Sequence, residues 1–222
     1  MIKIKNKAFT LSEVLITLAV VGTLAALVVP GLIKDYNSKA NMTMLQNMVA
    51  NLQSAVQTQM TRAGAIDLNA TDIVKDPEKF FRTLDVVNAS SDAKYFPDLS
   101  KYKLLNGKEL TAITKYNCAA SAKMKNGVAL CMTTTTTTNG DKMLFIDLNG
   151  EKEPNIAGLD FYEVFIQGKT ILDNGTRPHH IGDIRGVYVS NCTSNSSLAP
   201  AGCYSQAERS GFDPNYWKKL LQ

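Results

Sequence analysis

The sequence predicts an α+β protein in which a long N-terminal spine helix packs on a C-terminal antiparallel β-sheet domain. Three observations lead to this fold class. Residues 14–33 form an uncharged apolar run, and residues 34–62 continue it with the spacing of an amphipathic helix. After residue 127, three runs rich in apolar and β-branched residues are separated by turn signals, which is typical of an antiparallel sheet.

The composition of the 222-residue chain is that of a folded protein. Hydrophobic residues make up 45% and charged residues 20%, which disfavours a wholly disordered chain and a collagen-like fibre. The 24 basic and 20 acidic residues give a formal charge of +4, which is too small to indicate a nucleic-acid-binding protein. The N-terminal segment differs most from the rest of the chain and is the most informative about function.

The chain begins with a basic head in front of a membrane-spanning stretch. Residues 1–8 carry three lysines and no acidic residue. The apolar run 14–33 would span roughly 30 Å as an α-helix, which matches the hydrocarbon core of a bilayer. A basic head before a single apolar stretch predicts that the N-terminus stays in the cytoplasm and that the chain after Lys34 lies outside it.

An acidic residue, Glu13, stands at the start of the apolar run. A charged carboxylate in the middle of a membrane costs on the order of 3 kcal/mol, so such a residue needs a partner or a favourable position. One interpretation is that Glu13 only caps the helix at the level of the lipid headgroups, near the positive end of the helix dipole. The other is that its carboxylate takes part in assembly, and the residues around it favour this second interpretation.

The start of the chain resembles the processing site of type IV pilins and type II secretion pseudopilins over residues 7–13, Lys-Ala-Phe-Thr-Leu-Ser-Glu, and the apolar run behind them. The resemblance implies that Lys7, Ala8 and Phe9 form the cleavage site, where a prepilin peptidase cuts between Ala8 and Phe9. It also implies that Phe9 is then N-methylated and that Glu13 is needed for assembly. The family more often has glycine before the cut, and Ala8 is a tolerated departure.

Two further positions match the same resemblance. Gly22 stands where many helices of the family loosen, and Pro30 stands where they commonly kink. Pro30 also predicts a bend on physical grounds, because proline removes a backbone donor and clashes with the preceding turn.

The second half of the helix is predicted from apolar residues that recur at three- and four-residue spacing. The residues on this stripe are Leu45, Met48, Val49, Leu52, Ala55, Val56, Gln59 and Met60. We expect the stripe to pack on the protein's own sheet; a coiled coil is the alternative, but the run is too short for several regular heptads. Gly64 predicts the end of the helix.

The remainder of the chain is predicted to be a connecting region followed by a sheet. Residues 65–117 are interpreted as a variable connection that contains a short helix over 77–84. Strands are predicted within residues 127–138, 142–150 and 161–168, which gives an antiparallel sheet of at least three strands. The six threonines at 133–138 are interpreted as part of a polar strand, with an O-glycosylated patch as the alternative.

The residues after the second of these runs resemble a further signature of pseudopilins and related minor pilins. The signature is D-x-N-G-x-x-x-P-N-x-x-G-x-D, and its residues are Asp147, Asn149, Gly150, Pro154, Asn155, Gly158 and Asp160. The alternating oxygens of Asp147, Asn149 and Glu151 also suggest a calcium loop, since hard cations bind such ligands. The glycine comes too early for an EF-hand, so a metal-free turn without a cofactor is preferred and calcium is the alternative.

All four cysteines lie after the apolar run, hence in a compartment where disulfides persist. They are Cys118, Cys131, Cys192 and Cys203. Three pairings are possible; pairing of sequence neighbours would close a hairpin-like loop and a Ser/Asn-rich loop, each stabilising by roughly 3 kcal/mol. Zinc is the competing interpretation, but no C-x-x-C spacing occurs, so disulfides are predicted.

The sequence contains none of the common catalytic motifs. It has no G-x-S-x-G, no H-E-x-x-H and no phosphate-binding glycine loop. We therefore expect a structural subunit and not an enzyme.

The resemblance implies three parts of the chain. These are a leader at 1–8, an N-terminal helix at 9–62 with its transmembrane part at 9–33, and an extracytoplasmic globular domain at 63–222. The protein would be a subunit of a type IV pilus or of a type II secretion pseudopilus, and its length favours a minor pilin or pseudopilin. It would enter the inner membrane as a single-pass protein and end in a periplasmic or cell-surface filament. Expected partners are other pilin subunits, the prepilin peptidase, an inner-membrane assembly platform and, before assembly, the lipid bilayer, but not nucleic acid.

Two alternative functions remain open. A tip adhesin or a DNA-capturing minor pilin would need a local basic or aromatic surface. A simple signal-anchored extracytoplasmic protein would keep its leader lysines. The C-terminal aromatic residues are expected either to form a contact surface or to pack the chain end on the sheet; they are Tyr204, Phe212, Tyr216 and Trp217.

Overall fold

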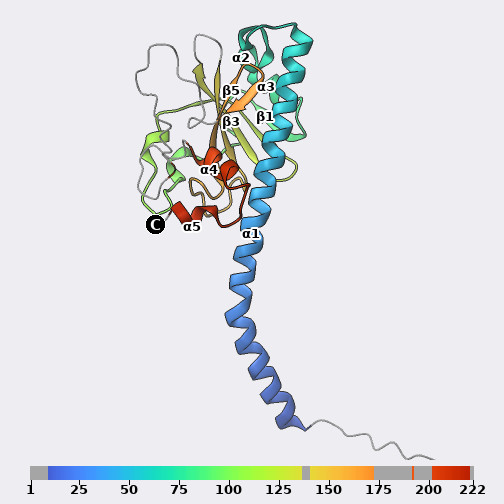
Figure 1. Ribbon diagram of the computed structural model, residues 1–222, viewed down its shortest axis with the longest axis vertical. Helices are drawn as coiled ribbons and strands as arrows, with labels where there is room; N and C mark the ends of the chain where they lie inside the picture. The colour runs from blue at the N-terminus through green and yellow to red at the C-terminus, as the bar shows by residue number, and fades with distance from the viewer. Residues whose placement is uncertain (1–9, 137–140, 173–191, 193–201, 221–222) are drawn as a thin grey trace, which may run out of the picture.

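The computed structural model describes residues 10–136, 141–172, 192 and 202–220 (Figure 1). Its helices are α1 (Leu11–Ala63), α2 (Asp72–Lys75), α3 (Pro77–Phe81), α4 (Cys203–Arg209) and α5 (Tyr216–Leu220). Its strands are β1 (Val86–Ser90), β2 (Cys118–Met124), β3 (Ala129–Thr136), β4 (Lys142–Asp147), β5 (Phe161–Gln167) and β6 (Thr170–Leu172). Three 3-10 turns lie at Leu68–Ala70, Leu99–Lys101 and Thr111–Ile113.

The spine helix α1 runs from Leu11 to Ala63 without a break. Gly64 ends it in the left-handed conformation, with φ 56°, where glycine avoids the strain that a β-carbon would bring. The end predicted at Gly64 is confirmed. Figure 1 shows that the upper half of α1 lies along the globular part, whereas the lower half projects away from it and curves.

The upper half of α1 buries the predicted apolar stripe. Leu45, Leu52 and Val56 are fully buried, and the stripe joins one hydrophobic core with residues of the sheet. Each such leucine or valine stabilises the fold by about 1.5–3 kcal/mol through the apolar surface it removes from water. The expected packing of the stripe on the protein's own sheet is confirmed.

The sheet is an antiparallel meander in which the strand order follows the sequence, β1-β2-β3-β4-β5-β6. Strands β3, β4 and β5 lie in the predicted runs. Strands β1 and β2, which precede these runs, and β6, which follows them, were not predicted. β2 is rich in alanine, and β1 and β6 are only five and three residues long, so each gives a weak strand signal. The short helix predicted over 77–84 is α3, which ends earlier, at Phe81.

Both faces of the sheet are buried. In β4, Leu144 and Ile146 face the core under α1, while Met143 and Phe145 belong to a second hydrophobic cluster on the opposite face. This second cluster includes Phe96, Tyr102, Leu104, Leu110 and Ile113. The segment 91–117, which connects β1 to β2, therefore also covers one face of the sheet.

Two disulfides bind the domain together. Cys118 is bonded to Cys131 across β2 and β3, and Cys192 is bonded to Cys203 at the start of α4. The expectation of disulfide bonds is confirmed, and the partners are the sequence neighbours.

Candidate functional site: the exposed half of the spine helix

The lower half of α1, residues 11–29, is the most unusual surface of the protein. Every residue in it is exposed, including large apolar side chains such as Leu11 and Leu27, which are 79% and 80% exposed. Leu11–Val29 is long and apolar enough to cross a membrane and is a candidate membrane anchor. An apolar surface of this extent does not remain in water, so it requires a bilayer or other protein segments.

Glu13 closes a capping box at the beginning of this half. Its Oε2 accepts hydrogen bonds from the backbone N–H and the hydroxyl of Thr10, both at 2.9 Å. The Thr10 hydroxyl oxygen accepts in turn from the backbone N–H of Glu13 at 3.2 Å. Among the described residues, none of the three salt bridges includes Glu13, so its charge is oriented by the cap but is not neutralised by a cation.

The other predicted site residues of this region fall in three places. Lys7, Ala8 and Phe9 lie outside the described residues. Gly22 lies inside the continuous helix, and a β-carbon at this position would meet no atom within 4 Å. Pro30 also lies within α1.

Within the described part of the chain, side-chain hydrogen bonds of three residues attach the upper half of α1 to the domain. Ser38 Oγ accepts from the Trp217 indole N–H at 3.2 Å, and Asn41 Nδ2 donates to the Leu159 carbonyl at 3.3 Å. Gln53 binds the backbone of β6, since its Oε1 accepts from the Ile171 N–H at 2.7 Å. Gln53 makes two of these bonds, since its Nε2 also donates to the Lys169 carbonyl. The attachment therefore begins near Ser38.

The loop between β4 and β5 carries the second predicted signature, and buried carboxylates organise it. Asp147 Oδ1 accepts from the backbone N–H groups of Asn149 (3.0 Å) and Gly150 (2.7 Å), and its Oδ2 accepts from the Tyr102 hydroxyl. Glu151 is exposed, so the three ligands suggested for calcium do not share one environment. Within the described ranges, no group of three His, Cys, Asp or Glu side chains is arranged to hold a metal.

The second carboxylate of the loop, Asp160, binds three donors. Its oxygens accept from the Asn149 side-chain amide at 2.8 Å and from the backbone N–H groups of Asn155 and Ile156 at 2.9 Å and 2.6 Å. Gly158, in the same loop, has a φ of 85°. A β-carbon at this position would come within 3.1 Å of Cys192 Sγ and 3.2 Å of Cys203 Sγ. The signature is therefore a structural loop that supports the second disulfide.

Burial raises the pKa of Asp147 to about 7 and that of Asp160 to about 6, and hydrogen bonds from Tyr102 and from backbone amides only partly oppose this. Between the unfolded value of 3.8 and these values, the folded protein binds more protons than the unfolded chain. The contribution of both groups to stability is therefore full at low pH and is lost as the pH rises toward 7.

We expect the free energy of unfolding to fall by about 4 kcal/mol between about pH 5 and about pH 8 from these two groups, and by only about 1 kcal/mol in an Asp147→Asn variant. Asparagine keeps an oxygen for the backbone amides but does not titrate. Urea unfolding of the full chain in detergent, followed by tryptophan fluorescence, measures both values. An equal fall in the two proteins would contradict the assignment to Asp147.

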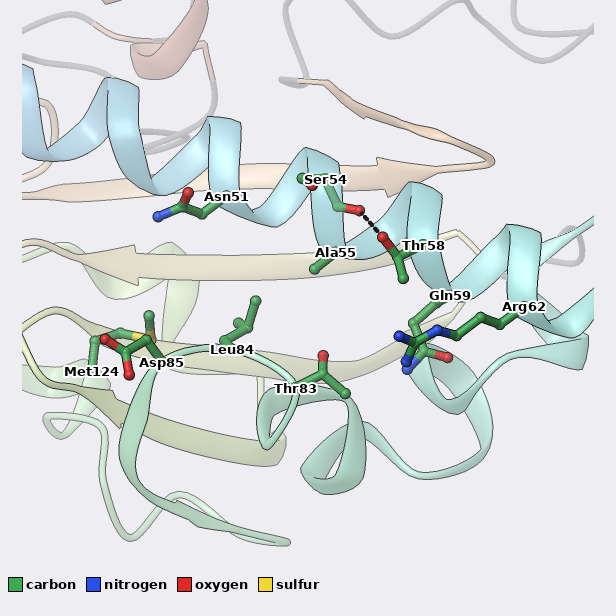
Figure 2. A pocket seen from close by; sticks show the side chains of 10 residues that line it. All are labelled: Asn51, Ser54, Ala55, Thr58, Gln59, Arg62, Thr83, Leu84, Asp85 and Met124. Carbon is green, nitrogen blue, oxygen red and sulfur yellow. Dashed lines mark hydrogen bonds between the residues drawn. The ribbon is translucent and has the colours of Figure 1, made fainter.

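A groove beside the upper half of α1 is the other candidate surface (Figure 2). It has a volume of about 390 Å³ and lies between α1 and the segment that follows α3. Arg62 and Asp85 stand at opposite ends of it in Figure 2, and Asp85 forms an ion pair with Lys125. Its lining includes neither cysteine nor histidine.

An α+β domain on a helix whose apolar half is exposed defines a class of protein: a globular domain carried by an N-terminal anchor or assembly helix. The comparison with protein families makes this more specific. The family model of the prokaryotic N-terminal methylation motif matches residues 3–29, so the chain carries a prepilin-type signal of the type IV pilin and pseudopilin kind. The match spans the basic head, Phe9, Glu13 and the exposed half of α1. Comparisons with curated proteins and with solved structures found no match.

Several parts of the site were not predicted from the sequence. The bonds of Ser38, Asn41 and Gln53 join residues 116 or more positions apart. Tyr102, the hydroxyl partner of Asp147, lies in the segment interpreted as a connection. Tyr204, Tyr216 and Trp217 are buried, which decides in favour of packing at the chain end.

Proposed function

We propose that the protein is a structural subunit of a type IV pilus or of a type II secretion pseudopilus. It enters the inner membrane through residues 9–33 with its N-terminus in the cytoplasm. A prepilin peptidase removes the leader 1–8 by cutting between Ala8 and Phe9, and Phe9 is methylated. The subunit then polymerises with other pilin subunits through its helix, with help from the inner-membrane assembly platform.

The observation that carries this proposal is the coincidence of two features in one segment. The methylation motif at residues 3–29 covers the same residues that the fold leaves exposed and apolar, 11–29. A secretory signal peptide is cut after its apolar segment, whereas cleavage before that segment keeps it as part of the mature protein. The retained helix is a membrane anchor first and packs against other subunits afterwards. The motif points to a structural protein rather than an enzyme.

Glu13 has a defined place in this proposal. Once the leader is removed, Phe9 carries a free amine, and the same amine of a neighbouring subunit can neutralise the Glu13 carboxylate. Pairing is required because a charge that enters an apolar filament core is strongly unfavourable unless it is paired. The pair would set the axial register between subunits, and the capping box already holds the carboxylate at the helix start.

We expect co-expression with a prepilin peptidase to remove residues 1–8 and leave Phe9, with or without a methyl group, as the first residue. The intact mass and N-terminal residue of the purified protein measure this, with expression in the absence of the peptidase as the control. A leader that stays intact in both cultures would leave a simple membrane anchor. Cleavage after the apolar run would indicate a secreted protein, and either result would contradict assembly through α1.

A further inference from the structure

The C-terminal helix α5 lies at the lower end of the globular part, next to the point where α1 leaves it (Figure 1). The Trp217 indole N–H donates to Ser38 Oγ at 3.2 Å and to the Pro214 carbonyl at 3.0 Å. Both Tyr216 and Trp217 are buried. Helix α5 is therefore held at a defined height along α1, the height of Ser38.

This height coincides with the surface of a bilayer that α1 spans. The uncharged run ends at residue 33, and Ser38 follows five residues later in the same unbroken helix. At 1.5 Å per residue, Ser38 lies roughly 8 Å beyond the hydrocarbon core. The headgroup layer on each side of a bilayer is roughly 5–8 Å thick. The underside of α5 thus meets the outer part of the headgroup layer.

The side chains at this height are those that favour such a layer. Lys39 and Lys218 are exposed, and Lys218 Nζ lies 5.7 Å from the centre of the Trp217 ring. Tyr36 is 73% exposed. Over residues 36–39 and 213–218, whose side chains the structure describes, there are two lysines and one aspartate. Aromatic residues and lysines together are typical of membrane interfaces, and a lysine near an anionic surface is attracted to it.

We propose that a basal surface made of the exposed side chains of Tyr36, Lys39 and Lys218, next to the buried Trp217, rests on anionic phospholipid headgroups while the subunit is in the membrane. The inference rests on the insertion of α1 that the proposed function requires. Headgroups are the occupant because the basal surface continues directly from the exposed apolar half of α1 and because lysines exceed aspartates there. The contact holds the globular domain in one orientation above the bilayer before the subunit is extracted into a filament.

Trp217 is the only tryptophan of the chain and therefore reports this contact directly. The full chain is reconstituted in vesicles of phosphatidylcholine and phosphatidylglycerol that contain a lipid with a nitroxide on its headgroup. The comparison protein combines Trp217→Phe with Ile66→Trp. Ile66 is 99% exposed and follows the far end of α1, which lies roughly 38 Å from Ser38 along the helix. We expect headgroup nitroxide to quench Trp217 at least about threefold more than the tryptophan of the comparison protein.

Charge reversal tests the recognition of anionic lipid. A Lys39→Glu/Lys218→Glu variant is expected to lose about half of the Trp217 quenching in these vesicles. In vesicles of pure phosphatidylcholine, the same variant is expected to be quenched as much as the unchanged protein. The matched control, Lys75→Glu/Lys79→Glu, changes two exposed lysines of α2 and α3 near the opposite end of the domain and should leave quenching unchanged (Figure 1). Equal quenching in both charge variants would overturn the recognition of anionic lipid.

Resistance of the protein to carbonate extraction distinguishes a failure of the basal contact from a failure of the membrane anchor. If the chain resists extraction but Trp217 is quenched no more than the comparison tryptophan, the basal contact is wrong while the anchor stands. If the chain is extracted, the membrane anchor of the proposed function is wrong, and the basal contact falls with it.

Discussion

A Glu13→Gln variant is expected to enter the membrane and to be cleaved normally. The amount of this variant found in filaments is expected to be more than about a hundredfold lower than that of the unchanged protein. Breaking a buried ion pair by removing one partner costs about 3–5 kcal/mol, and here that cost recurs at every subunit contact. Glutamine keeps a side-chain oxygen for the Thr10 backbone N–H, so the helix cap is largely retained. A quantitative immunoblot of sheared filaments measures the loss, and the N-terminal mass verifies cleavage.

The matched control is Thr10→Val, which removes the hydroxyl from the capping box and leaves the Glu13 carboxylate in place. Loss of this cap costs about 1 kcal/mol of local helix stability, so the variant should still assemble at close to the normal level. Equal losses in the two variants would mean that Glu13 acts only as a cap. Normal assembly of Glu13→Gln would remove the proposed pairing with the Phe9 amine.

An Asp160→Ala variant is expected to lose about 3 kcal/mol of unfolding free energy. The substitution leaves three donors without their acceptor: the Asn149 amide and the backbone N–H groups of Asn155 and Ile156. A buried donor that loses a charged partner costs about 1–3 kcal/mol, and of these donors the Asn155 N–H is buried while the other two are half-buried. The loss is partly offset because a buried carboxylate is no longer ionised. Urea unfolding of the full chain in detergent, monitored by Trp217 fluorescence, measures the change.

Asp98→Ala is the matched control for this substitution. The Asp98 carboxylate also accepts from a backbone N–H, that of Ser100 at 2.8 Å, but it is exposed to water. Its loss should cost less than about 1 kcal/mol, because water replaces the missing acceptor. An equally small effect of Asp160→Ala would show that the loop between β4 and β5 does not depend on this carboxylate.

The two halves of α1 illustrate how far local sequence information reaches. Its existence, its stripe from Leu45 to Met60 and its end at Gly64 follow from periodicity and from the conformational freedom of glycine, which are properties of neighbouring residues. Strand β2 was not predicted, because Cys118–Met124 is rich in alanine and acquires its role only between β1 and β3. Successive side chains of β4 face two different hydrophobic cores, and this could not be predicted from the sequence either. All six residues of the strand are buried, so no polar residues mark one face.

By itself, the sequence determined the features that a short stretch of chain can encode. These are the α+β class, the basic head, the apolar run with Glu13 at its start and the presence of disulfides. The tertiary structure decided what covers each face of the sheet, how Asp147 and Asp160 are buried, and where α5 meets α1 at Ser38. The physical reason is that burial and long-range hydrogen bonds join residues far apart in the chain, and no local pattern specifies those partners.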